Sequence, residues 1–312
     1  MSEEKERIID ALEWTLRDII NAIPDIAKKG YTGVQTSPVQ PHKEIMEQYR
    51  HDEWYKLFQP LGFSIGNDLG TKEDLIELCE VAHKYNVKIY VNTILNHMAN
   101  LDGNHESEPA KEVDPVLLEN EGFWKDKNII QNWEDRWQCV NWCNKLAALD
   151  LRNKDLEKIV VDFLNEMIDC GVDGFRLDAL KHIMLPSEGS DFLNIFKEDA
   201  NVLHNRENLT IYGELIHIND MNLLEQYIQC GIKPMINLSD TAYRFRDEGK
   251  TDQIYTFFES ADSFLNKDDF GWSRKLDDKV ILDNTYYLNK DFKNTIAYSR
   301  NYDFWKRIDL AK

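Results

Sequence analysis

The sequence has few cysteines and no long apolar run. Five cysteines occur among its 312 residues, an odd number, and no two of them have CxxC spacing. No apolar run approaches the roughly 20 residues that cross a bilayer, which argues against a membrane protein. We expect free, buried thiols, rather than metal ligands or a redox pair, at Cys79, Cys139, Cys143, Cys170 and Cys230.

Positive charge is also scarce. Lysine and arginine number 37 against 56 aspartates and glutamates, which gives a formal net charge of −19. Such a surface repels phosphates and anionic lipids, so we expect neither a nucleic acid nor a membrane partner, but a neutral substrate. Residues 1–7 are charged and no apolar segment follows them, so no secretion signal is predicted. We therefore expect a cytoplasmic protein, although a trimmed secreted chain would have the same sequence.

Short β-rich runs alternate with longer amphipathic ones along most of the chain. This alternation predicts a parallel sheet covered by helices, either a (β/α)8 TIM barrel or a doubly wound open sheet. The predicted strands lie at 8–12, 32–38, 87–91, 172–178, 209–214, 233–238, 253–259 and 294–299. The predicted helices lie at 15–29 with an interruption at Pro24, from Thr71 onward, at 156–170, 191–203 and 220–230, and from about residue 273.

One stretch breaks the alternation. Residues 98–149 show no sustained periodicity and follow the third predicted strand, where a barrel places its active-site loops. We therefore predict a small inserted domain at 98–149, and a catalytic barrel formed by 1–97 and 150–312. Phe304 begins only part of a last helix, so we expect that helix to be truncated.

Three predicted strands end near an acid. Asp178, Glu214 and Asp262 would therefore converge at the carboxyl end of a barrel. Retaining glycosidases need two carboxylates about 5–5.5 Å apart, one as nucleophile and one as general acid and base. Arg176 lies two residues before Asp178, on the same side of the strand, where it would keep a nucleophile ionised. Each acid taken alone could instead be a solvated loop residue or a helix cap.

Several segments in order carry a family resemblance. They are VNTILNH at 91–97, GFRLDALKH at 174–182, YGE at 212–214 and ESAD at 259–262, with further similarity at 31–38 and 54–60. Together they resemble the α-amylase family of glycoside hydrolases, and the smaller bacterial α-amylases most of all. The resemblance runs from about residue 8 to about residue 300. It implies the (β/α)8 TIM barrel rather than the open sheet.

The resemblance also implies roles for individual residues. Asp178 would be the nucleophile, Glu214 the general acid and base, and Asp262 the residue that stabilises the transition state. Apart from the resemblance, aromatics in and around the loops, such as Tyr55, Phe58 and Trp142, are candidates to stack on sugar faces, with ordinary core packing as the alternative. The substrate-binding residues implied are Tyr55, Phe58, Gln59, His97, Arg176, Lys181 and His182.

A calcium ion between barrel and insert is the family's usual stabiliser. The resemblance implies side-chain oxygen ligands from Asn96 and Asp150 and a backbone carbonyl ligand from His182. Such oxygen ligands suit calcium. The alternative is that Asn96 and Asp150 cap loop backbone groups.

The chain departs from the family pattern at several positions. Asn92 replaces an aspartate, Ala261 a histidine, Phe58 a tyrosine and Lys56 an aromatic residue. We also expect no C-terminal β-sandwich. The leading hypothesis is a retaining enzyme that acts on α-1,4-glucans or maltooligosaccharides, by hydrolysis or transglycosylation. The second is a catalytically impaired carbohydrate-binding or regulatory relative.

A third hypothesis is an unrelated barrel enzyme such as an aldolase. It lacks support, because no lysine stands at a strand end in an apolar run and no phosphate-binding glycine loop is visible. The sequence predicts an oligo- or polysaccharide partner and leaves the oligomeric state open.

Overall fold

Eight parallel strands close into a barrel. The computed structural model describes residues 5–101, 106–216, 218–265 and 277–307. The strands follow one another around the barrel in the order β1-β10-β9-β8-β7-β6-β3-β2. Their bounds are β1 Glu6–Ala11, β2 Gly33–Thr36, β3 Lys88–Thr93, β6 Gly174–Leu177, β7 Thr210–Glu214, β8 Lys233–Asn237, β9 Tyr255–Phe257 and β10 Asn294–Tyr298. The closed order confirms the (β/α)8 TIM barrel and excludes the open sheet.

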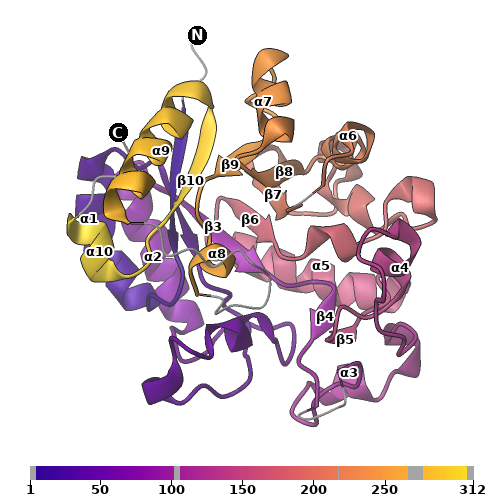
Figure 1. Ribbon diagram of the computed structural model, residues 1–312. Helices are drawn as coiled ribbons and strands as arrows, with labels where there is room; N and C mark the ends of the chain where they lie inside the picture. The colour runs from indigo at the N-terminus through magenta and orange to yellow at the C-terminus, as the bar shows by residue number, and fades with distance from the viewer. Residues whose placement is uncertain (1–4, 102–105, 217, 266–276, 308–312) are drawn as a thin grey trace.

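Helices surround the barrel (Figure 1). Their bounds are α1 Leu16–Lys29, α2 Lys72–Lys84, α5 Lys154–Asp169, α6 Met221–Gln229, α7 Asp240–Asp247, α8 Ala261–Leu265, α9 Asp278–Asp291 and α10 Tyr302–Arg307. Short 3₁₀ helices cover Glu47–Tyr49, Trp54–Phe58, Glu121–Phe123, Leu180–His182, Pro186–Glu188, Phe192–Phe196, Glu198–Ala200 and Arg206–Asn208. Among the described residues, no helix is long and apolar enough to cross a membrane.

Helix ends follow the predicted signals. Thr71 caps α2 and forms a reciprocal capping box with Asp74. Gly30 ends α1 in the left-handed conformation. The predicted interruption at Pro24 is wrong, because α1 continues through it. Pro24 lies on the exposed side, where water can hydrate the backbone carbonyl that loses its N–H partner, while the opposite side of α1 is buried.

The predicted helix at 191–203 is also wrong. Two 3₁₀ helices, Phe192–Phe196 and Glu198–Ala200, occupy that stretch. The Arg206 guanidinium donates to the Phe196 carbonyl over 2.6 Å, so that oxygen is bound by a side chain rather than by a helical N–H. Asn201 then adopts the left-handed conformation, with φ of 54°. The hydrogen bond from Arg206 to this backbone carbonyl therefore favours the 3₁₀ turns over the α-helix that the apolar periodicity predicted.

Tyrosines fill much of the barrel interior. Tyr90, Tyr212 and Tyr255 are fully buried and in ring contact, with Tyr212 and Tyr255 stacked at 4.4 Å between centroids. The Tyr212 hydroxyl donates to Gln35 over 2.9 Å. Gly174 lets β6 approach β7, since a Cβ atom there would lie 1.9 Å from the Thr210 carbonyl oxygen. The barrel is thus a packed core, and the site lies at one of its ends.

The insert folds beside the carboxyl ends of the strands. Its base is a two-stranded antiparallel sheet of β4 His97–Met98 and β5 Ala147–Ala148. It carries α3 Pro115–Leu118 and α4 Arg136–Asn141. Figure 1 shows the insert and the long segment between β2 and α2 at the same end of the barrel. These two segments flank the strand ends where the predicted acids lie.

Candidate active site

A cavity of about 400 Å³ opens at the carboxyl ends of the strands. Its volume falls within the range of small-molecule sites. Of the eleven residues expected to act in catalysis, substrate binding or sugar stacking, eight line this cavity. They are Tyr55, Phe58, Gln59, His97, Arg176, Asp178, Glu214 and Asp262.

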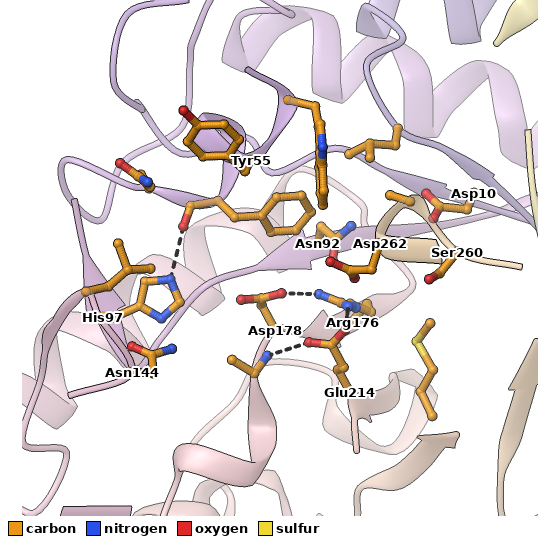
Figure 2. A pocket seen from close by; sticks show the side chains of 18 of the residues that line it. Asp10, Tyr55, Asn92, His97, Asn144, Arg176, Asp178, Glu214, Ser260 and Asp262 are labelled. Atoms are coloured by element: carbon orange, nitrogen blue, oxygen red, sulfur yellow. Dashed lines mark hydrogen bonds and ion pairs between the residues drawn. The ribbon is translucent and has the colours of Figure 1, made fainter. Parts of the chain in front are cut away.

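Arg176 lies at the centre of the charged groups (Figure 2). Its Nη1 donates to Asp178, and its Nη2 lies 2.8 Å from Oε1 of Glu214. The backbone N–H of Ala179 donates to Oε2 of Glu214 over 3.2 Å. Asp178 follows β6 directly and Glu214 ends β7, the neighbouring strand. One buried guanidinium therefore holds both carboxylates.

Burial opposes ionisation of Asp178. The residue is 9% exposed, and burial raises the pKa of its carboxyl group, whereas the charge and hydrogen bond of Arg176 oppose that rise. Arg176 itself stays charged, because Glu214 and Asp178 raise its pKa more than burial lowers it. Asp262 lies in the first turn of α8, on the exposed side of the same cavity.

His97 is a neutral imidazole with an unused acceptor. Burial lowers its pKa to about 4. Its Nε2 lies 3.0 Å from the Phe58 carbonyl, which can only accept, so Nε2 carries the proton (Figure 2). Nδ1 is then an acceptor, and it has no hydrogen-bond partner among the described residues. This nitrogen is buried.

Aromatic rings form one wall of the cavity. Tyr55, which is 46% exposed, and Phe58 both line it, with Trp54 packed edge-on against Phe58 at 5.9 Å. The Arg176 guanidinium lies 5.9 Å from the Phe58 ring centre. Trp142, expected to stack on sugars, does not line the cavity and instead packs against Trp137 at 5.7 Å.

Lys181 and His182 lie outside the cavity lining. The Lys181 ammonium sits 5.1 Å from the ring centre of Trp133. His182 is buried, and its Nδ1 lies 2.9 Å from the Cys139 carbonyl. Both side chains therefore contact the insert.

Several lining residues were not predicted. They are Asp10, Leu12, Gln35, Trp54, Asn144, Lys145, Leu146, Ala179, Met235 and Ser260. The sequence does contain an indication for Asp10. A lone carboxylate inside an apolar strand run is costly to bury without a partner, so its presence there suggests a function. Asn144 and Lys145 belong to the aperiodic insert, where no pattern marks individual residues.

Three departures from the family pattern fall in the cavity lining: Phe58, which keeps the ring of a tyrosine, and Asn92 and Ala261. Asn92 is 2% exposed and pairs in register with Arg176 across β3 and β6. Its Oδ1 has no hydrogen-bond partner among the described residues. Ala261 presents only a methyl group where the family has a histidine.

The oxygens predicted to hold calcium are close to cations of the protein itself. Both carboxylate oxygens of Asp150 accept from Arg152, each over 2.7 Å. The His182 carbonyl accepts from Nζ of Lys125 over 3.1 Å. Burial lowers the pKa of Lys125 to about 8, so it is mostly an ammonium at pH 7.

Only the Asn96 Oδ1 is without a hydrogen-bond partner among the described residues. Throughout the residues that the structure describes, no group of three or more His, Cys, Asp and Glu side chains is placed to hold a metal ion. As arranged, these oxygens fit a calcium ion poorly.

Comparison with known proteins places these features in a family. The profile of the alpha amylase catalytic domain matches residues 13–229, more than half of the chain. An α-amylase of Clostridium acetobutylicum is 32% identical over 250 residues, which cover 76% of this chain and 30% of that protein. An α-amylase of Butyrivibrio fibrisolvens is 26% identical, covering 94% and 34%. The chain thus spans about a third of the length of these relatives.

A solved structure has the same fold. α-Amylase I of Eisenia fetida superimposes with a TM-score of 0.72 at 20% identity, covering 94% of this chain and 66% of that one. The likeness supports the barrel, and the family profile covers Arg176, Asp178 and Glu214. On these grounds, the chain belongs to the α-amylase family of glycoside hydrolases.

Proposed function

We propose that the chain is a retaining glycosidase that acts on α-1,4-linked glucans or maltooligosaccharides. One observation carries the proposal: a single guanidinium, that of Arg176, binds Asp178 and Glu214 at neighbouring strand ends. That arrangement favours the separation of about 5–5.5 Å used by retaining enzymes over the 6.5–9.5 Å of inverting ones. A complex of the Eisenia fetida α-amylase with maltohexaose supports the substrate class.

Each carboxylate has one role in this proposal. Asp178 attacks the anomeric carbon while Glu214, protonated, gives its proton to the leaving oxygen as the glycosidic bond breaks. Water then attacks the glycosyl–Asp178 ester, loses a proton to Glu214 and releases the sugar. A sugar acceptor in place of water would give transglycosylation. Asp262 would stabilise the positive charge that develops on the sugar.

A second candidate is a glycan-binding relative with impaired chemistry. Two residues of the cavity favour this candidate. Ala261 removes the hydrogen-bond donor of a histidine and Asn92 removes the charge of an aspartate, while the three acids are kept. Each missing charge-assisted bond removes about 1.5–3 kcal/mol. The two candidates differ in turnover, not in sugar binding.

Asp10 lines the same cavity from another strand, and its carboxyl group carries a negative charge only when it is ionised. It lies on β1, is 7% exposed, and attracts Arg176 electrostatically. Tyr212 and Tyr298 interact with it electrostatically, and both remain neutral because burial raises their pKa well above the ordinary value. In our proposal Asp10, when it is ionised, is a positioning residue for Arg176 and offsets the charge absent at Asn92.

The first prediction concerns the two carboxylates. Asp178→Asn should lower the release of reducing ends from maltoheptaose on the order of 10³-fold or more, and Glu214→Gln about 10²–10⁴-fold. The control is Asp191→Asn, at an aspartate whose side chain is 63% exposed and which should keep full activity. Wild-type turnover in Asp178→Asn would overturn the proposal. Maltoheptaose binding without turnover in the wild type would favour the second candidate.

The second prediction concerns the missing histidine. Ala261→His should raise kcat/KM on maltoheptaose about 10–100-fold, because it restores a donor to the sugar. Ala261→Leu fills the same space without a donor and should bring no gain. If the two variants behaved alike, the absent histidine would not limit catalysis.

The third prediction concerns pH. Burial raises the pKa of Asp10 from 3.8 to about 7. The Asp10 carboxyl group therefore loses its proton at a lower pH in the unfolded chain than in the folded chain. As a result, the free energy of unfolding decreases as pH rises from about 4 to 7. Asp10→Asn removes that loss. Its free energy of unfolding relative to wild type should thus increase by about 2–3 kcal/mol between pH 5 and pH 8, measured by urea unfolding.

The matched control is Asp162→Asn, at an exposed aspartate of α5. Its difference from the wild type should be the same at both pH values. A pH-independent difference for Asp10→Asn would contradict the placement of Asp10 as a buried, titrating neighbour of Arg176.

A further inference from the structure

The insert contacts the barrel at the turn that follows β6. This turn contains the 3₁₀ helix Leu180–His182, directly after Asp178 and Ala179. The backbone carbonyls of Lys181, His182 and Ile183 all accept hydrogen bonds from side chains of the insert. The turn that carries the candidate nucleophile is therefore held from the insert side.

Both donors at this junction are cations of the chain. Lys125 Nζ donates to the His182 carbonyl over 3.1 Å. Arg136 donates to the Lys181 carbonyl, and to the Ile183 carbonyl over 3.2 Å. Its charge is balanced by Glu188, which accepts from Nε and Nη2 over 2.6 and 2.8 Å. Among the described residues, no carboxylate binds Lys125 directly in this way.

The backbone of Lys125 is part of the same junction. Its N–H donates to the Ala148 carbonyl over 2.9 Å, beside the bridge between Trp124 and Leu149. Leu149 in turn donates to the Asn96 carbonyl over 2.9 Å. The side chain of Lys125 thus starts where the insert rejoins the barrel and ends on the turn after β6. It links three segments far apart in the sequence.

We propose that the Lys125 ammonium takes the place of a metal ion at this junction, so that the fold needs no calcium there. A metal ion would lie between the insert and the His182 carbonyl. The ammonium group of Lys125, which belongs to the chain itself, occupies that position.

Charge supports the proposal. Lys125, Arg136 and Arg152 place three positive groups around this junction, and both oxygens of Asp150 are bound by Arg152. A divalent cation would be repelled by these groups and would have to displace Lys125 from its carbonyl. A single charge on a tethered side chain also needs fewer anionic ligands than a calcium ion does.

The first experiment measures thermal unfolding of the wild type in millimolar calcium and in excess EDTA. We expect the same Tm in both. A Tm that rises with calcium, together with loss of that rise in Asn96→Ala, would overturn the proposal. This arm needs no variant of Lys125 and so remains decisive if such variants fail to fold.

The second experiment compares Lys125→Met with Lys127→Met. The first replaces the ammonium with an apolar chain of similar length and leaves the His182 carbonyl unpaired, so we expect a Tm lower by about 3–8 °C and faster proteolysis within 106–149. The Lys127 side chain is 65% exposed, and its ammonium makes a long ion pair of 3.8 Å with Glu108. Such an exposed pair adds little stability, so Lys127→Met should match the wild type. Equal Tm values for the two variants would overturn the proposal.

Discussion

The buried guanidinium of Arg176 is the constraint on which the rest of the site depends. A charge at 6% exposure is costly unless it is paired, and its partners are Asp178 and Glu214, the two acids proposed to do the chemistry. The barrel supplies the geometry, since β6 and β7 are neighbours and Gly174 lets them approach closely. The fold and the proposed reaction therefore share one ion-pair network. Removing either carboxylate would leave a buried positive charge as well as an incomplete reaction centre.

The distribution of charge inside the molecule contrasts with its composition. The whole chain carries a formal charge of −19, yet the site and its nearby junction are organised around Arg176, Arg136 and Lys125. Each of these cations binds groups on the segment that follows β6 or on its neighbour. In our account, internal cations hold the turn after Asp178 from both sides, from the barrel interior and from the insert. In this account the candidate nucleophile is supported by side chains of the protein rather than by a bound metal ion.

Much of the barrel and the cavity could be predicted from the sequence, because strand periodicity and ordered motifs report on local structure. Asp178, Glu214 and Arg176 stood out as charged residues at the end of apolar runs. The helix expected at 191–203 failed because Arg206, several residues later, captures the Phe196 carbonyl. The electrostatic interaction of Asp10 with Arg176 and the hydrogen bond of Lys125 to the His182 carbonyl join distant segments, and no local pattern encodes them.

In the proposed reaction Asp178, held by Arg176, forms a covalent bond to the sugar. The most direct measurement is incubation with a 5-fluoro-α-glucosyl fluoride, followed by peptide mass spectrometry, because such a reagent slows breakdown of the glycosyl-enzyme more than its formation. Our account predicts one glycosyl adduct, on the peptide that contains Asp178, and its loss when maltoheptaose protects the site. An adduct confined to another carboxylate, or no adduct on protein that releases reducing ends, would contradict it.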